Sequence, residues 1–454
     1  MTTGNELSFA VSFRRELGPF DATMVVIGGI IGSGIFINPY LVARALDTPA
    51  LVLGAWAMGG AVAIAGALSY AELAKLLPRA GGQYVYLRDA WHPVVGFLYG
   101  WALLLMIETG AIAAVAIAFS KYTLRLAGAG DLPTQPLAVA SIVVLSVINY
   151  FGVKPGARVT NVFVVLKVAA LGVLILFAWF QPAMPGWLSA GRVDDTPSTA
   201  MTFGIALIPI LFAYGGWQVS TYLAEEMRDP VRDLPRSLII GTLCVVAIYL
   251  LVNVAYLRTL GLDGLAATTT PAAETAGRWF GALGERFVAA AIAISTFGFL
   301  SLSVLAPTRV YYAMAADGAF LPALAKLHPK YGVPGAAIIL QAVWSIALAL
   351  TGSYDQLLAW VVFADWIFFG LTVAGLFILR ARLPPTPGYK TPGYPFVPIF
   401  FVAVAVVVVY SAIQDAPDRS LKGAALLLAG IPVFYLFKWW TSRRRAAGQG
   451  VANQ

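Results

Sequence analysis

The sequence predicts an all-α protein that crosses a membrane many times. Of its 454 residues, 59% are hydrophobic and only 11% are charged, and the mean hydropathy is +0.80. A soluble protein carries roughly 25% charged residues, which it needs to cover its surface. The apolar residues also form continuous runs of roughly 20 residues, the length that a helix needs to cross the hydrocarbon core of a bilayer. We therefore predict a polytopic membrane protein built as one bundle of helices.

Twelve apolar runs are predicted to be transmembrane helices. They lie near residues 20–43, 50–75, 94–122, 136–152, 160–180, 201–224, 237–258, 287–314, 335–351, 356–380, 396–412 and 421–440. The chain then divides into an N-terminal segment (1–19), a first group of five spans (20–180), a second group of five (201–380), two final spans (396–440) and a tail (441–454).

The positive charges predict the orientation of these spans. Most of the 30 Lys and Arg residues fall in connections that would share one side of the membrane. Cytoplasmic loops carry such an excess, so we expect both the N-terminal segment and the tail to be cytoplasmic. The net charge of +8 is then a feature of topology, and it does not indicate nucleic-acid binding.

Residue usage argues against an enzyme and against a metal protein. The chain has one cysteine, Cys244, and two histidines, His92 and His328, which both lie beside prolines at loop-like positions. These residues supply neither a metal site nor a Ser/His/Asp set. No phosphate-binding G-x-x-x-x-G-K-[ST] segment occurs, so we expect the chain to have no ATP-hydrolysing site of its own. We expect no cofactor, and we expect any transport to be driven by a gradient or by exchange.

Two of the predicted spans contain clusters of glycine. Span one reads GGIIGSGIF at 28–36, and span six reads PILFAYGGWQ at 209–218. Each glycine destabilises a helix interior by about 1 kcal/mol relative to alanine, so both helices should unwind locally. Breaks five spans apart indicate two five-helix halves of opposite orientation, with a binding site near the middle of the membrane. The alternative is close helix packing through Gly28 and Gly32.

A broken helix suits a ligand that carries one negative and one positive group. The N–H groups at the start of a half-helix attract a carboxylate, and the carbonyls at the end of the other half attract an ammonium. Two such breaks side by side would bind the zwitterionic part of an amino acid without a charged side chain. The candidate substrate-binding residues are Ile30, Gly32, Ser33, Gly34, Phe212, Gly215 and Gln218.

These same segments carry a family resemblance. GSGIF at 32–36, FAYGGW at 212–217, EEMRDP at 225–230 and LPR at 234–236 resemble the amino acid–polyamine–organocation (APC) superfamily of transporters. The chain is most similar to the L-amino-acid transporter branch and its bacterial relatives. This resemblance implies a five-plus-five inverted-repeat (leucine-transporter-type) fold with unwound helices 1 and 6, followed by two extra helices. It also implies alternating access, Phe212 as an aromatic gate, and the bacterial inner membrane as the location.

The sequence departs from the family pattern at two places. Animal members of the branch join a glycoprotein through a cysteine between spans three and four, and residues 123–135 contain none. We therefore expect no disulfide-linked heavy chain. Many relatives have Asn after the Gly-Gly-Trp segment, whereas this chain has Gln218. That position bears on which substrate side chain is accepted.

Ionisable residues within the spans are candidates for coupling, because each is costly to insert into a bilayer. Lys167 lies in span five. The resemblance implies that it replaces the Na⁺ ion of sodium-coupled relatives, by bonding the carbonyls of the span-one break and a hydroxyl of span eight, Ser295 or Thr296. The alternative for Lys167 is a side chain that extends to the membrane surface. Glu72 lies near a predicted helix end and is interpreted as interfacial.

Three roles stay open for Glu108, in the middle of span three. They are a proton site, a partner for a cationic substrate and a hydrogen-bonded structural carboxyl. In span ten, Asp365 and Trp366 are candidates for contact with the substrate side chain, although Asp365 also suits a structural role and Trp366 a lipid-facing one.

Together these features predict a secondary active transporter of neutral L-amino acids. It would be independent of Na⁺ and would work by exchange or by proton symport in the lipid bilayer. Two alternatives stay open. One is an amino acid receptor or channel without coupled transport, and the other is a transporter of cationic amino acids or polyamines.

Overall fold

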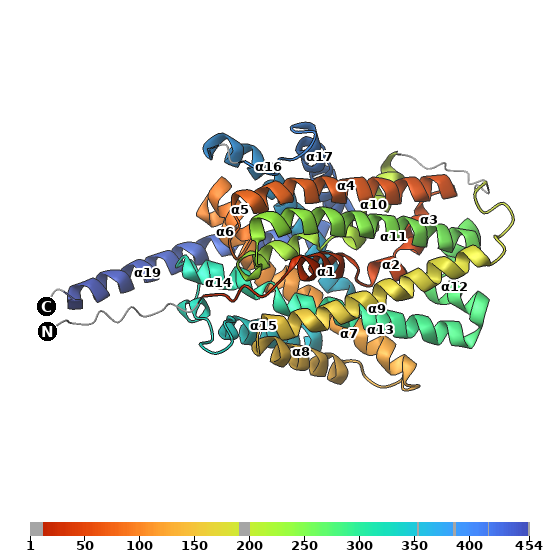
Figure 1. Ribbon diagram of the computed structural model, residues 1–454, viewed down its shortest axis with the longest axis horizontal. Coiled ribbons are helices and arrows are strands. Elements are labelled where there is room, and N and C mark those ends of the chain that lie inside the picture. Colours follow the sequence, from red (N-terminus) through yellow and green to blue (C-terminus); the bar gives the residue numbers. More distant parts are fainter. Residues whose placement is uncertain (1–11, 190–199, 352–353, 385–386, 416, 453–454) are drawn as a thin grey trace.

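The computed structural model describes residues 12–189, 200–351, 354–384, 387–415 and 417–452. The predicted N-terminal segment therefore lies partly outside the described residues, as does the end of the predicted tail. In the part that is described, the protein is a bundle of helices (Figure 1). Its β-structure there is limited to one bridge between Leu17 and Met227.

The first half of the chain forms helices over the first five predicted spans. The run at 20–43 is divided into three short helices, and the run at 94–122 contains a π-helical segment. The elements are α1 (Pro19–Ile30), α2 (Gly34–Ile37), α3 (Pro39–Ala45), α4 (Pro49–Leu76), α5 (Gln83–Ala90), α6 (Pro93–Ala102), η1 (Leu103–Ile107), α7 (Glu108–Leu126), α8 (Gln135–Tyr150) and α9 (Val153–Phe180).

The second half is interrupted in the same way near its start. The run at 201–224 is an α-helix followed by a 3-10 helix. The elements are α10 (Ala200–Tyr214), η2 (Trp217–Glu226), α11 (Pro230–Ala267), α12 (Pro271–Phe280), α13 (Ala282–Leu305), α14 (Thr308–Ala316), η3 (Pro322–Ala325), α15 (Gly335–Thr351) and α16 (Tyr354–Arg382).

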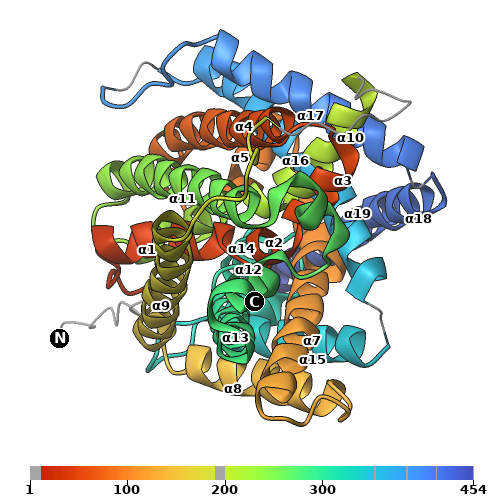
Figure 2. The same cartoon turned by 90° about the vertical axis from the view of Figure 1, so that its right-hand side faces the viewer.

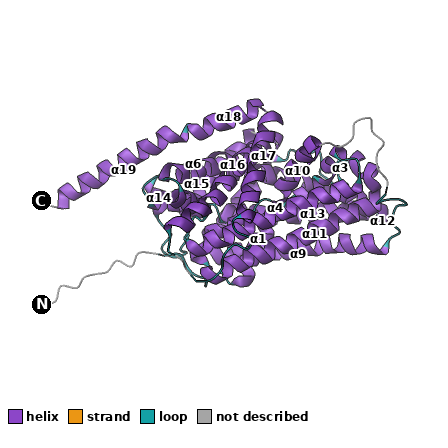
Figure 3. Cartoon of the chain, turned by 90° about the horizontal axis from the view of Figure 1, so that it is seen from above, coloured by secondary structure: helices purple, strands orange, loops and turns teal. Residues whose placement is uncertain are grey.

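Three more helices complete the chain: α17 (Phe396–Asp415), α18 (Pro417–Leu428) and α19 (Gly430–Ala452). The last predicted span, 421–440, therefore belongs to two helices rather than one. The predicted tail from 441 onward is also helical as far as Ala452, and Figure 3 shows α19 extending well away from the bundle.

Local sequence explains where several helices begin. Proline stands in the first turn of α1, α3, α4, α6 and α11, where its missing N–H has no intrahelical partner to lose. Thr48 caps α4 by accepting a hydrogen bond from the Leu51 N–H, and Asp229 caps α11 by accepting one from Arg232.

Within the described ranges, nine helices are long and apolar enough to cross a membrane. Three further apolar helices, Pro19–Ile30, Gln135–Tyr150 and Gly335–Thr351, are shorter than a standard span. The structure therefore establishes a polytopic membrane protein, and the count of twelve spans stays a prediction.

The two closest helix pairs join the first part of the chain to the second. α4, over the second predicted span, packs most extensively against α11, over the seventh, and α7, over the third, packs against α13, over the eighth. Figure 2 looks along the bundle and shows α1 entering between α11 and α9, with α2 near the middle. The interrupted helices thus lie inside the bundle, where irregular backbone is shielded from lipid.

Candidate functional site

The first helix break lies inside the bundle, at residues 31–33. α1 ends at Ile30, Ile31 adopts an extended conformation (φ −76°, ψ 91°), and α2 begins at Gly34. A helix that starts at Gly34 leaves its first N–H groups without intrahelical partners. A β-carbon on Gly34 would lie 2.9 Å from Cβ of Ala213, so the α2 backbone can approach α10 closely only because this residue is glycine.

The second break follows α10. The helix ends at Tyr214, and Gly216 has a φ of +105°, in the left-handed region that favours glycine. Beyond it the chain continues as the tighter 3-10 helix η2. The Gln218 side chain folds back, and its Oε1 accepts a hydrogen bond of 3.0 Å from the Gly216 N–H. Gln218 therefore supports the backbone of the break through this hydrogen bond.

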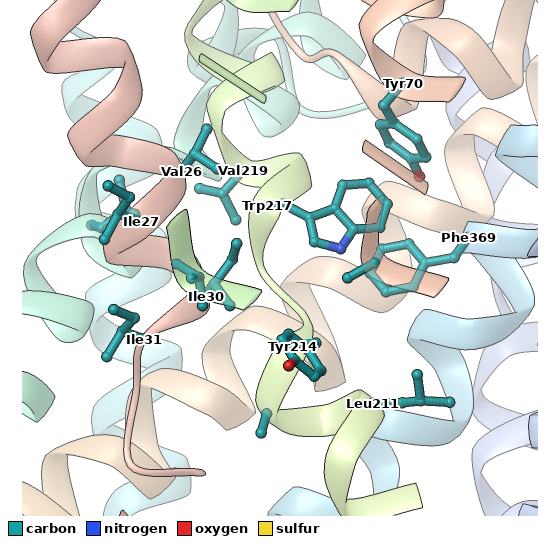
Figure 4. Packing of buried hydrophobic residues seen from close by; sticks show 14 of the residues in the cluster. Val26, Ile27, Ile30, Ile31, Tyr70, Leu211, Tyr214, Trp217, Val219 and Phe369 are labelled. Atoms are coloured by element: carbon teal, nitrogen blue, oxygen red, sulfur yellow. The ribbon is translucent and has the colours of Figure 1, made fainter. Parts of the chain in front are cut away.

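The last turn of α1, just before the first break, touches the second break. A β-carbon on Gly216 would lie 2.0 Å from the carbonyl oxygen of Gly29, and one on Gly29 would lie 2.5 Å from the carbonyl oxygen of Gly216. Figure 4 shows the end of α1 at Ile30 and Ile31 near the chain that carries Tyr214, Trp217 and Val219. Segments almost 190 residues apart in the sequence therefore form one site.

Tyr249 of α11 joins the two breaks, a role that no sequence pattern predicts. Its buried hydroxyl lies 3.1 Å from the carbonyl oxygen of Ile30 and 3.1 Å from that of Ala213. Tyr249 stands in a long apolar run, where nothing in the local pattern distinguishes it from a packing residue.

We expect Tyr249→Phe to weaken amino acid binding about twofold to twelvefold, because a lost buried hydrogen bond contributes roughly 0.5–1.5 kcal/mol. The dissociation constant of the purified variant measures the effect. Tyr410→Phe, which changes a side chain that is 62% exposed, is the matched control. Unchanged affinity in Tyr249→Phe would show that this hydroxyl does not hold the breaks in their binding geometry.

A cavity of about 100 Å³ opens where the breaks meet. All seven predicted substrate-binding residues line it, and so does Glu108. The cavity is closed on other sides by side chains that the sequence did not single out, Ile107, Phe299 and Phe369 among them. Lys167 and Ser295 do not line the cavity.

Lys167 and Ser295 instead lie behind the first break. The Lys167 side chain is fully buried, and its ammonium donates hydrogen bonds to the carbonyls of Gly28, at 3.0 Å, and Ile31. The Ser295 hydroxyl lies 3.1 Å from the carbonyl oxygen of Gly32 and 3.5 Å from that of Ile31. Thr296, the other hydroxyl considered for this contact, bonds carbonyls of its own helix. Lys167 of α9 thus connects to the break and, through Ile31, to α13.

Two carboxyl groups face the cavity from opposite halves of the chain. Glu108 follows the π-helical segment η1 and has Ser303 of α13 as a hydrogen-bonding partner. Asp365 of α16 is partly buried, and among the described residues its buried Oδ1 atom has no hydrogen-bond partner. Trp366 is only 6% exposed and lines the cavity, so it does not face lipid. A cavity with these groups offers acceptors to a ligand that carries hydrogen-bond donors.

Hydrogen bonds join the segment just before α1 to the end of η2. The N–H groups of Glu16 and Leu17, just before α1, donate to the Glu226 carbonyl at the end of η2. The Glu226 carboxylate forms a two-bond ion pair, at 2.7 and 3.1 Å, with the fully buried Arg309 of α14. Both interrupted helices are therefore anchored to the same buried pair.

The fold defines the chain as a polytopic membrane protein, and comparison with known proteins identifies its family. Residues 17–435 match the amino acid permease family, and the chain belongs to it, within the APC superfamily of amino acid transporters.

Individual relatives cover nearly the whole chain. It is 32% identical over 431 residues to the serine/threonine exchanger SteT of Bacillus subtilis, a match that covers 94% of this chain and 97% of that protein. It is 29% identical to the human large neutral amino acids transporter small subunit 2, over 95% of this chain and 82% of that protein. The mouse b(0,+)-type amino acid transporter 1 is 28% identical over 94% of this chain and 89% of that protein.

Proposed function

We propose that this protein is a Na⁺-independent secondary active transporter of neutral L-amino acids that works by alternating access. The observation that carries the proposal is the close approach of the end of α1 to the second break, at a cavity that both helix breaks line. The pairing of α4 with α11 and of α7 with α13 supports a five-plus-five inverted repeat, because corresponding helices of two such halves pack together. The bacterial inner membrane, with both termini in the cytoplasm, is part of the same proposal.

The backbone of the breaks would recognise the two α groups of the substrate. The N–H groups of Ser33 and Gly34, at the start of α2, would donate to the carboxylate, where the helix dipole also favours negative charge. The carbonyls of Ile30, Phe212 and Gly215 would accept from the ammonium. The Ile30 carbonyl already accepts from the Gly32 N–H and the Tyr249 hydroxyl, and the Phe212 carbonyl from the Gly215 N–H. Those contacts fix the direction in which each carbonyl points, and the Phe212 ring would close over the bound ligand as the gate.

Lys167 would replace a coupling cation. Its ammonium already occupies the space between the first break and α9, with the Ser295 hydroxyl on the same carbonyl group of Ile31. The Lys167 ammonium binds the carbonyl oxygens of the first break, as a bound Na⁺ would. Transport would therefore not require Na⁺.

The carboxyl groups at the cavity bear on the substrate side chain and on coupling. The first relative carries the name of a serine/threonine exchanger, and a side-chain hydroxyl would supply the hydrogen bond that the Asp365 Oδ1 atom lacks among the described residues. This favours exchange of small neutral amino acids. The second candidate is a cationic amino acid or polyamine, which two carboxyl groups in one cavity would also attract.

Uptake into proteoliposomes tests the function. We expect labelled serine or another neutral amino acid to enter only when unlabelled amino acid is inside, and equally well when choline replaces Na⁺. Uptake into empty vesicles driven by a pH gradient would instead indicate proton symport through Glu108. Preferential uptake of arginine or a polyamine would overturn the neutral assignment. Binding without any uptake would indicate a receptor, and uptake at channel rates without saturation would indicate a channel.

A further inference from the structure

A second cavity, of about 180 Å³, lies between the ends of α4 and α16 and shares no lining residue with the substrate site. Its polar lining consists of Glu72, Lys75, Arg380 and Lys390, and its apolar lining of leucines and one proline. Three cations and one anion give this cavity an excess of positive charge. It lies at the end of the bundle where α4 leads into α5 (Figure 1), the side that the sequence predicts to be cytoplasmic.

The charged groups are held in place by a network around Glu72, which is 3% exposed. Its carboxylate pairs with Arg380 through two bonds of 2.7 and 2.6 Å, and it accepts a third, of 2.7 Å, from the Thr391 N–H. Glu72 is therefore a buried carboxylate held by an ion pair, close to the end of α4. The Arg380 guanidinium also lies over the Tyr394 ring, 3.6 Å from its centroid.

Two lysines from different segments of the chain also line the cavity. Lys75 is only 8% exposed, and its ammonium lies 3.3 Å from the Tyr389 carbonyl oxygen. Lys390 stands on the chain that passes over the cavity, between Tyr389 and Thr391, which are both fastened to the Leu68 carbonyl on α4. A segment fixed on both sides of Lys390 holds its ammonium near the cavity with little loss of chain entropy on binding.

An apolar surface adjoins this charged cavity. α17 begins only six residues after Lys390, and its first residues present large side chains to the outside. Phe396 is 76% exposed and Ile399 is 52% exposed. An ion from solution would use the cavity alone, whereas a phospholipid would use both surfaces, with its phosphate at the lysines and its acyl chains along α17.

We propose that this cavity binds the phosphate headgroup of an anionic phospholipid of the inner leaflet. The occupant is chosen by charge complementarity, since cationic pockets between transmembrane helices on the cytoplasmic side suit anionic headgroups. A phosphate at Lys75 and Lys390 connects α4 to the chain between α16 and α17. Bound lipid therefore stabilises the contact between these helices. The site is separate from amino acid recognition, so its test does not depend on the proposed transport function.

The test uses the full chain in nanodiscs of phosphatidylcholine that contain increasing fractions of phosphatidylglycerol, with the unfolding temperature as the readout. We expect phosphatidylglycerol to raise this temperature in a saturable way. Lys390→Gln should shift the half-saturating fraction about fivefold upward, because one cation near an anionic surface contributes about that factor. The matched control is Lys326→Gln, which removes an exposed lysine outside the cavity.

Three outcomes would overturn the proposal. One is an unfolding temperature that does not respond to phosphatidylglycerol, and another is an equal shift in Lys390→Gln and Lys326→Gln. The third is full stabilisation by inorganic phosphate in discs of phosphatidylcholine alone, which would make the ligand a soluble anion. If Lys390→Gln proves unstable, Lys75→Gln gives the same comparison from the α4 side.

Discussion

Replacing Lys167 by alanine is expected to lower amino acid uptake at least about 100-fold. The substitution removes a buried ammonium that donates to the carbonyls of Gly28 and Ile31, and each charge-assisted hydrogen bond contributes roughly 1.5–3 kcal/mol. It leaves the carbonyls of the first break directed into a buried space without their donor. Initial rates of exchange in proteoliposomes, at equal amounts of reconstituted protein, measure the effect.

The control for this variant is Lys154→Ala, which changes a partly exposed lysine at the start of the same helix, α9. We expect its uptake to stay near that of the parent protein. Addition of Na⁺ to Lys167→Ala is a further comparison, because a small cation would occupy the space that the ammonium leaves. Parental uptake rates in Lys167→Ala, with or without Na⁺, would contradict the proposed role.

Gly216→Ala is expected to have the second large effect, a loss of measurable substrate binding. The residue has a φ of +105°, and its β-carbon would lie 2.0 Å from the Gly29 carbonyl oxygen, well inside contact distance. The left-handed conformation alone costs an alanine roughly 1–2 kcal/mol. The two breaks would have to separate, and the carbonyls that face the substrate would move with them.

Thermal stabilisation by amino acid, compared with uptake, measures this effect. Gly204→Ala is the matched control, because it makes the same substitution within α10, the helix that precedes the break, and its β-carbon would meet nothing within 4 Å. If Gly216→Ala binds and transports like Gly204→Ala, close contact between the breaks is not needed for function.

The glycine clusters predicted the region of the site. The two interpretations of span one, local unwinding and close helix packing, turn out to hold together. Gly28 and Gly29 remain helical, and the break falls at 31–33. A β-carbon on Gly28 would lie 2.9 Å from the Val164 side chain, so this glycine serves close packing. Composition indicates where a helix is weak. Which residue leaves the helix is decided by neighbours that pack against it, and those come from other parts of the chain.

Contacts between distant segments account for what the sequence did not predict. Tyr249 joins two carbonyls in different helices, and the Glu72–Arg380 pair connects residues 308 positions apart. Trp366 has the same local pattern whether it faces lipid or a cavity. Apolar periodicity does not distinguish these cases, because in a bilayer both the outer and the inner faces of a helix are apolar.

In the proposed mechanism, main-chain groups at the two breaks recognise both charged groups of an amino acid. The most direct measurement compares the binding of a transported amino acid with that of its carboxamide and its N-acetyl derivative, on the purified protein. We predict that each derivative loses at least about 100-fold in affinity, since each removes one charged partner of the backbone. Equal affinity for the carboxamide, or for the amine that lacks the carboxylate entirely, would contradict this account.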